Sequence, residues 1–278
     1  MGKIDRRRNA PYPPIIALLT DFGDRDGYVG SLKGVILGIC PEARLVDITH
    51  QAPPRDVRAG AFILGSVYRD FPDGTIHLAV VDPGVGTERA ALAVRTPRCT
   101  LVGPDNGIFS DVLESERDVE ARRLENPAYW RPTVCPTFHG RDLFAPVAAH
   151  LASGAPFDLL GPPCAPTAPE RRPSPKESAG RLEGEIIHID RFGNAITDIS
   201  RAELEAFAPA AAWTLRVGDE VISSLATTYG ESAPGARLAL IGSSGRLEIA
   251  VNLGSAEKEL GLRRGELVVL SRGEPVIG

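Results

Sequence analysis

Three clusters of polar residues could carry chemistry in this chain. They are TDFGDRD at 20–26, DPGVGTER at 82–89 and TFHGRD at 137–142. Carboxylates and an imidazole can transfer a proton near neutral pH, and guanidinium groups can orient a substrate. The clusters are therefore candidate parts of an active site.

His139 is the histidine that best fits proton transfer. It lies between Phe138 and Gly140 in a loop rich in Arg and Asp, where a carboxylate would orient it. A packed loop residue is the alternative interpretation. We expect His77, inside an apolar run, and His150, on a helix, to be structural.

Asp82 and Arg89 are a second candidate pair. Asp82 follows a predicted strand, and Arg89 lies seven residues further on, beyond a Pro-Gly turn. This spacing fits an ion pair across a turn as well as a catalytic pair. The GVG at 84–86 resembles the start of a dinucleotide fingerprint, but Arg89 occupies the third glycine position and no P-loop is present. The sequence therefore favours neither a Rossmann cofactor nor ATP.

The first cluster has several interpretations. Its Asp-Phe-Gly also occurs in kinases, but the Gly-rich and catalytic loops of a kinase are missing. Asp24, Asp26 and Gly27 resemble part of a calcium loop, without the later ligands that such a loop needs. We predict no metal here. A carboxylate at a strand end suits the two hydroxyls of a ribose, so Asp21 is either a ribose ligand or a turn cap.

Strands and helices alternate in the first half of the chain. This order predicts an α/β domain whose mostly parallel sheet is flanked by helices, and ligands bind beyond the carboxyl ends of such strands. The first two clusters follow two of these strands. The predicted strands are 15–19, 45–49, 75–81, 91–94 and 100–103, and the predicted helices are 28–39, 57–68 and 143–151.

The second half of the chain has a different residue pattern. A stretch rich in Pro, Ser and charge interrupts the periodicity, and short alternating runs separated by glycine turns follow it. These runs predict a smaller antiparallel, barrel-like β domain. The expected organisation is a flexible tail at 1–14, the α/β domain at 15–162, a linker at 163–180 and the β domain at 181–278.

Composition excludes several protein classes. The 278 residues carry a net charge of −5, which argues against a nucleic-acid binder. No apolar run is long enough for a membrane span, and no signal-peptide core is present, so we expect no membrane partner. The four cysteines form no C-x-x-C pair, which favours reduced thiols and a cytoplasmic location.

Five motifs in order resemble one family. LLTDFGDRDGYVG, VDPGVGTER, GPDNG, TFHGRD and IDRFGN, spread between 15 and 270, are similar to motifs of the S-adenosyl-L-methionine hydroxide adenosyltransferases, relatives of the fluorinase and chlorinase. The resemblance implies hydrolysis of S-adenosyl-L-methionine to adenosine and L-methionine, with no additional cofactor. It also implies a homotrimer with active sites between subunits.

The resemblance assigns roles residue by residue. The family's catalytic triad falls on Asp82, Arg89 and His139. We expect Asp82 and His139 to position the attacking water and accept its proton, with either as the final acceptor, while Arg89 balances the charge of Asp82. The implied substrate-binding residues are Asp21, Asp26, Asn106, Thr137, Phe138, Asp190, Phe192, Asn194 and Ser243.

A halogenase is the nearest alternative enzyme. Asp82 would repel a halide, and the matching halogenase position is uncharged. The fluorinase also has TFYS where this chain has TFHG, and it has a long insertion where this chain has only RTPR at 95–98. Two positions depart from the family pattern: the Arg that meets the methionine carboxylate falls on Ser244, and a ribose-pocket aromatic falls on Arg55.

Two hypotheses from other classes stay open at the level of sequence. A binding module could hold S-adenosyl-L-methionine or adenosine without turnover. A structural or interaction protein would use its arginines only as solvated charge. The intact set of Asp82, Arg89 and His139 favours the enzyme.

Overall fold

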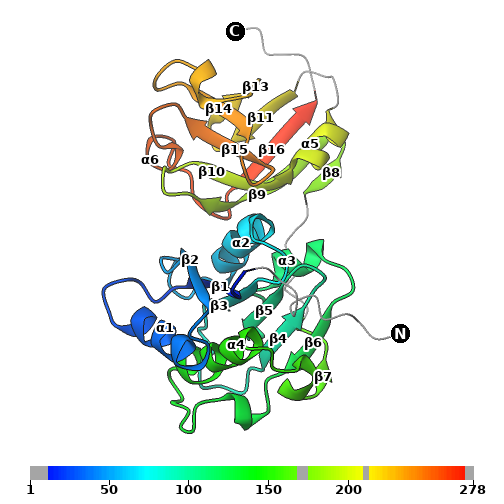
Figure 1. Ribbon diagram of the computed structural model, residues 1–278. Coiled ribbons are helices and arrows are strands. Elements are labelled where there is room, and N and C mark those ends of the chain that lie inside the picture. The colour runs from blue at the N-terminus through cyan, green and yellow to red at the C-terminus, as the bar shows by residue number, and fades with distance from the viewer. Residues whose placement is uncertain (1–11, 168–174, 209–212, 273–278) are drawn as a thin grey trace. The chain divides into compact units, whose positions relative to one another are not determined.

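The chain folds as two units, Met1–Glu170 and Arg171–Gly278, each with its own apolar core (Figure 1). The computed structural model describes residues 12–167, 175–208 and 213–272. The division between the units falls inside the predicted linker. The predicted α/β class with a smaller, mostly antiparallel β domain is confirmed.

A seven-stranded sheet in the order β2-β1-β3-β5-β4-β6-β7 is the centre of the first unit. The first four strands in this order are parallel, and the other three join as antiparallel neighbours. The central strands are almost wholly buried, as their largely apolar runs predict. The strands are β1 (Ile15–Thr20), β2 (Arg44–Thr49), β3 (Ile76–Val80), β4 (Ala91–Arg95), β5 (Thr100–Pro104), β6 (Glu120–Arg123) and β7 (Pro163–Cys164).

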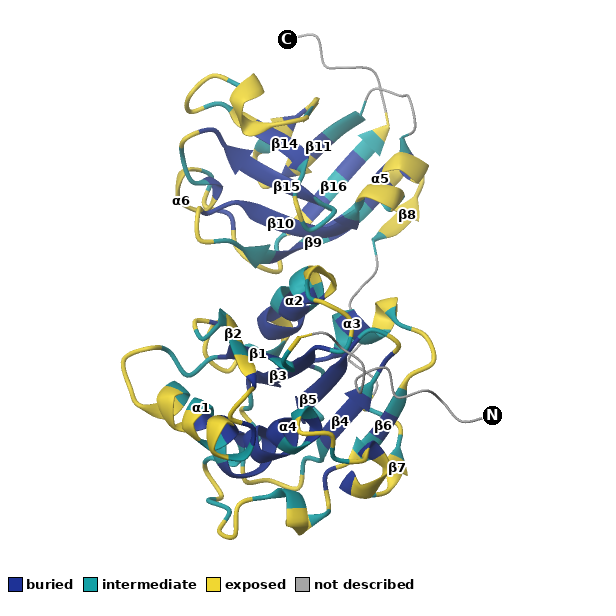
Figure 2. Ribbon diagram, viewed as in Figure 1, coloured by how far each residue is buried: buried dark blue, intermediate teal, exposed yellow. Residues whose placement is uncertain are grey.

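Helices cover both faces of this sheet. Figure 2 shows α1 and α4 on one side of the sheet and α2 and α3 on the other. The cores they build alternate along β3, since Leu78 packs in the core of α1 and α4 and Ala79 in the core of α2 and α3. The side chain of Asp56 caps α2 by accepting from the Ala59 amide at 2.9 Å. The helices are α1 (Tyr28–Ile39), α2 (Val57–Val67), α3 (Ser110–Ser115) and α4 (Ala145–Ala152), with a π-helical turn at Gly140–Phe144 and 3₁₀ turns at Tyr68–Asp70, Pro127–Tyr129 and Phe157–Leu160.

A nine-stranded sheet curls around the core of the second unit (Figure 1). Its strand pairs are antiparallel except for β13 and β14. The strands are β8 (Lys176–Ser178), β9 (Arg181–Ile189), β10 (Ala195–Ser200), β11 (Trp213–Val217), β12 (Glu220–Ile222), β13 (Leu225–Ala226), β14 (Arg237–Ile241), β15 (Arg246–Val251) and β16 (Leu267–Arg272), with α5 (Arg201–Phe207), α6 (Ala256–Glu259) and a 3₁₀ turn at Tyr229–Glu231.

The structure differs from the sequence-based expectations at the edges of the units. Residues 163–164 and 176–178 of the predicted linker lie in strands, since β7 pairs with β6 and β8 pairs with β9. Strands this short show no period in the sequence, so only their partners reveal them. Of the predicted tail, residues 1–11 lie outside the described residues. Pro14, its last residue, accepts a hydrogen bond from the Arg44 amide at 2.8 Å.

Within the described part of the chain, the helices are too short or too polar to cross a bilayer.

Candidate active site

The order of the parallel strands brings the first two polar clusters together. The chain runs from β1 outward to β2 and then returns to β3 on the other side of β1, so β1 and β3 flank a topological switch point. Thr20 pairs with Val80 in the β1–β3 register. Asp21 and Asp82 therefore follow neighbouring strands at the same edge, where open parallel sheets bind ligands.

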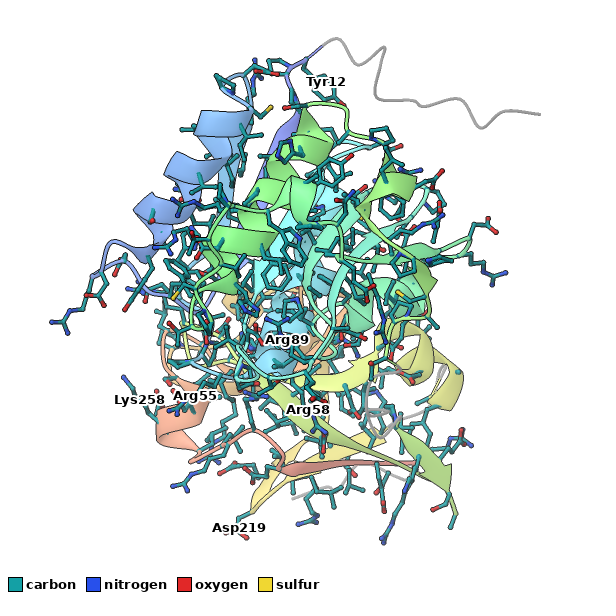
Figure 3. All side chains as sticks on the ribbon, turned by 90° about the horizontal axis from the view of Figure 1, so that it is seen from below. Tyr12, Arg55, Arg58, Arg89, Asp219 and Lys258 are labelled. Carbon is teal, nitrogen blue, oxygen red and sulfur yellow. The ribbon has the colours of Figure 1, made fainter. Side chains whose placement is uncertain are left out.

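Asp82 and Arg89 form a buried ion pair at this edge. Arg89 Nε lies 3.0 Å from both carboxylate oxygens of Asp82, and Arg89 Nη2 lies 2.6 Å from Oδ2. The Asp82 and Arg89 side chains are only 4% and 10% exposed. Arg89 lies among the crowded side chains near the centre of Figure 3, and its guanidinium stacks over the Phe144 ring at 5.2 Å. The pair is thus held rigidly and away from bulk water.

His139 joins this pair through Arg89. Arg89 Nη2 lies 2.8 Å from His139 Nδ1. A guanidinium can only donate, so Nδ1 accepts and the ring is neutral with its proton on Nε2. Burial lowers the pKa of His139, and the charge of Arg89 lowers it further. The structure therefore brings the three predicted catalytic residues together, with the arginine in the middle.

A glycine lets the second and third clusters approach each other. Gly86 has a φ of +80°, and a Cβ at that position would lie 2.7 Å from the carbonyl oxygen of Pro136. Any side chain would push the two loops apart. Gly140, at the start of the π-helical turn, is similarly crowded, because its Cβ would lie 3.0 Å from the Phe22 ring.

A backbone amide holds the Asp21 carboxylate in place. Asp21 Oδ2 accepts a 2.8 Å hydrogen bond from the amide of Arg55, whose φ of 63° is unusual for a residue with a side chain. The preceding Thr20 hydroxyl lies 2.8 Å from His50 Nδ1 and accepts from the Phe22 amide at 3.2 Å. Sequence reasoning missed His50, since nothing in its local pattern shows that it faces Thr20.

The other predicted ligands of the first unit have different surroundings. Asp26 is exposed in the loop before α1. Asn106 supports the strand end, because its Nδ2 donates to the Val81 carbonyl at 2.9 Å and its Oδ1 accepts from Ile108. Thr137 is exposed, with its hydroxyl 3.3 Å from the sulfur of Cys135.

Phe138 belongs to an aromatic cluster. Its ring centroid lies 5.7 Å from that of Phe22 and 5.3 Å from that of Tyr28, both in edge-to-face geometry. Phe22 and Tyr28 also contact each other at 6.2 Å. The cluster joins the loop that carries Asp21 to the loop that carries His139.

The predicted ligands of the second unit lie in two turns. Asp190 forms the turn between β9 and β10, since its Oδ1 accepts from the amides of Phe192 and Asn194 and its Oδ2 accepts from Asn194 Nδ2 at 2.9 Å. Phe192 is 75% exposed, which is unusual for a large apolar residue. Ser243 is exposed in the turn between β14 and β15.

Sequence reasoning also missed the buried carboxylate of Glu248 in the second unit. The Tyr229 hydroxyl donates to Glu248 Oε1 at 2.5 Å, and burial raises the pKa of Glu248. The signal was present, because Glu248 interrupts the apolar strand RLEIAV.

The described residues contain no group of three or more His, Cys, Asp or Glu side chains that could hold a metal ion.

Comparisons with known proteins cover both units. Residues 16–161 match the SAM hydroxide adenosyltransferase N-terminal domain, and residues 184–269 match the corresponding C-terminal domain. A protein of Thermus thermophilus named (R)-S-adenosyl-L-methionine hydrolase is 42% identical over 90% of this chain and 96% of its own length. Its namesake from Salinispora tropica is 39% identical over 94% and 98%.

More distant relatives and solved structures agree. A fluorinase of Nocardia brasiliensis is 30% identical over 94% of this chain and 97% of its own length. The crystal structure of an uncharacterized conserved protein from Thermotoga maritima superposes with a TM-score of 0.86 at 36% identity, over 92% of this chain and 100% of that one. The chain belongs to the SAM hydroxide adenosyltransferase family.

Proposed function

We propose that the protein hydrolyses S-adenosyl-L-methionine to adenosine and L-methionine. The observation that carries this proposal is the Asp82–Arg89–His139 cluster at the switch point of the sheet, in a chain with hydrolase-named relatives. Those relatives are named for the R form of the substrate, and we extend the proposal to that form.

The proposed reaction is a displacement at the ribose 5′ carbon. The oxygen of water forms a bond to this carbon while the bond from carbon to sulfur breaks, and its electron pair goes to sulfur. The sulfonium leaves as a neutral thioether, so the leaving group needs neither a proton nor a metal. Water is the weak partner, and it needs positioning and a proton acceptor.

Asp82 is the proposed final proton acceptor. His139 Nδ1 already accepts from Arg89 at 2.8 Å, and protonating it would set an imidazolium against a guanidinium. A proton on Asp82 instead replaces the positive charge that sulfur loses. His139 Nε2–H is left to orient the oxygen of the water, and Arg89 holds both partners.

The proposed substrate contacts follow the family resemblance. Asp21 would bind the ribose hydroxyls. The hydrogen bond from the Arg55 amide to Asp21 Oδ2 supports this role, because it fixes the orientation of the carboxylate. Asn106 would act indirectly, through the end of β3. The other proposed contacts are Asp26, Thr137, Phe138, Asp190, Phe192, Asn194 and Ser243.

The proposal includes a cytoplasmic homotrimer that needs no further cofactor. The family resemblance supports the assembly, and the four free cysteines support the location. Sedimentation equilibrium tests the assembly, with a single species of three chains as the expected result.

Product analysis in labelled water tests the reaction. The protein is incubated with S-adenosyl-L-methionine in oxygen-18 water that contains chloride, and the products are identified by mass. We expect oxygen-18 adenosine and methionine, with no 5′-chloro product, and loss of turnover in Asp82→Asn with substrate binding retained. A chlorinated nucleoside would mean a halogenase, and binding without turnover would mean a binding module.

A further inference from the structure

A buried carboxylate outside the triad anchors the loop that carries His139. Asp142 lies in the π-helical turn directly after His139, and its side chain is 0% exposed. Arg141 Nε and Nη2 donate to its two oxygens at 2.6 and 2.7 Å. Arg131 Nη1 donates at 3.0 Å and the Cys135 amide at 2.9 Å. We call these four residues the Asp142 clamp.

The clamp closes the loop at both ends. Besides its side-chain bonds, Asp142 accepts from the Arg131 amide with its carbonyl oxygen at 3.0 Å. Its own amide donates to the Phe138 carbonyl at 3.1 Å. Arg131 and Cys135 precede the TFH segment at 137–139 and Asp142 follows it, so one carboxylate fixes the entry and the exit of that segment.

The clamp also connects to the aromatic cluster. Arg141, which donates to both oxygens of Asp142, stacks over the Phe138 ring at 4.8 Å. Phe138 in turn contacts Phe22 and Tyr28. A displaced Asp142 would therefore release Phe138 as well as His139.

Charge explains why a carboxylate is needed. Four donors, three of them on the guanidinium groups of Arg141 and Arg131, hold the pKa of Asp142 at about 2 against the effect of burial, so it is ionised at neutral pH. Its charge also raises the pKa of His139, opposing Arg89. An amide has one acceptor oxygen and cannot satisfy these donors.

We propose that Asp142 is a positioning residue for the reaction: its clamp holds the 137–139 segment so that His139 Nδ1 faces Arg89. The inference rests on the proposed function for its catalytic readout. Its second readout, the state of the His139 ring, does not depend on any reaction.

Three variants of the full chain test the proposal. Asp142→Asn removes the charge and one acceptor of the clamp. Arg131→Gln is the milder variant, because Arg131 is 44% exposed and the other three donors remain. Asp198→Asn is the matched control, since Asp198 is also a buried carboxylate that accepts from an amide, but it lies in the second unit.

Two measurements are made on each variant. Steady-state release of adenosine gives kcat and KM, and nitrogen-15 NMR of the histidine rings gives the tautomer and titration of His139. We expect Asp142→Asn to lower kcat about 100-fold, as for misplaced catalytic groups, and also to raise KM, because the same loop carries the proposed contacts Thr137 and Phe138. The His139 ring should lose its fixed Nε2–H tautomer. Arg131→Gln should change both readouts in the same direction but less, and Asp198→Asn neither.

The outcomes separate this inference from the proposed function. Wild-type kcat and an unchanged His139 tautomer in Asp142→Asn would overturn the positioning role. If that variant does not fold, an Arg131→Gln protein with wild-type values of both readouts would overturn it instead. If the wild-type protein releases no adenosine, the proposed function fails, and the His139 tautomer still decides whether Asp142 positions the ring.

Discussion

Replacing Arg89 by methionine should lower the unfolding free energy, because it leaves the buried charge of Asp82 unpaired. Asp82 is 4% exposed and receives three close contacts from Arg89, at 2.6 to 3.0 Å. Methionine keeps an apolar contact for the Phe144 ring but leaves the carboxylate buried without its cation. Breaking a buried ion pair from one side costs about 3–5 kcal/mol, so we expect that loss in unfolding free energy at pH 8.

A double-mutant cycle in urea provides the assay. Asp82→Asn combined with Arg89→Met removes both charges, so it should be more stable than Arg89→Met alone, although it should be equally inactive. The unfolding midpoint is followed by circular dichroism at matched protein concentration. A loss below about 1 kcal/mol in Arg89→Met, or a double variant less stable than the single one, would refute the reasoning.

Three further predictions concern other positions. Gly86→Ala should lower the unfolding free energy by about 1–3 kcal/mol and reduce turnover, because its Cβ would lie 2.7 Å from the Pro136 carbonyl oxygen at a φ of +80°; urea melts and an activity assay measure this. His77 is fully buried and neither ring nitrogen has a partner, and burial lowers its pKa from 6.5 to about 4. Stability should therefore fall by about 3 kcal/mol as the pH drops from 6.5 to 4, and His77→Leu should abolish this part of the acid sensitivity in a pH series of melts. Arg55→Gly should raise the unfolding free energy by about 1 kcal/mol, because glycine adopts a φ of 63° without strain while its amide still donates to Asp21. A melting temperature that is unchanged or lower would contradict this.

Local pattern was sufficient for most of the first unit. The apolar runs that became β1 and β3 are short, with His77 the one interruption in β3, and the three- and four-residue spacing of apolar residues in α1 is equally plain. Such periods arise from burial of one element at a time, so they can be read without knowing its partners. The placement of Asp21 and Asp82 at strand ends followed from the same pattern.

Some features of the fold depend on contacts between distant parts of the chain and could not be predicted from the local sequence pattern. β7 has two residues and β8 has three, so their membership in the sheets depends on β6 and β9 rather than on a period of their own. Asn106 and Asp190 carry suitable side chains for ligands, yet the described structure uses them to hold the end of β3 and the β9–β10 turn. A residue type states which bonds are possible, whereas the fold selects the partner.

The proposed catalytic cluster shows both contributions. The amino-acid sequence predicted Asp82, Arg89 and His139 as a triad, because their motifs are local properties of the chain and resemble those of one family. Only the tertiary structure placed Arg89 between the other two, joined to a histidine fifty residues away, and that order determines the neutral tautomer of His139. It also revealed Asp142 as the anchor of the histidine loop, since the donors that surround a buried charge come together only when the chain folds.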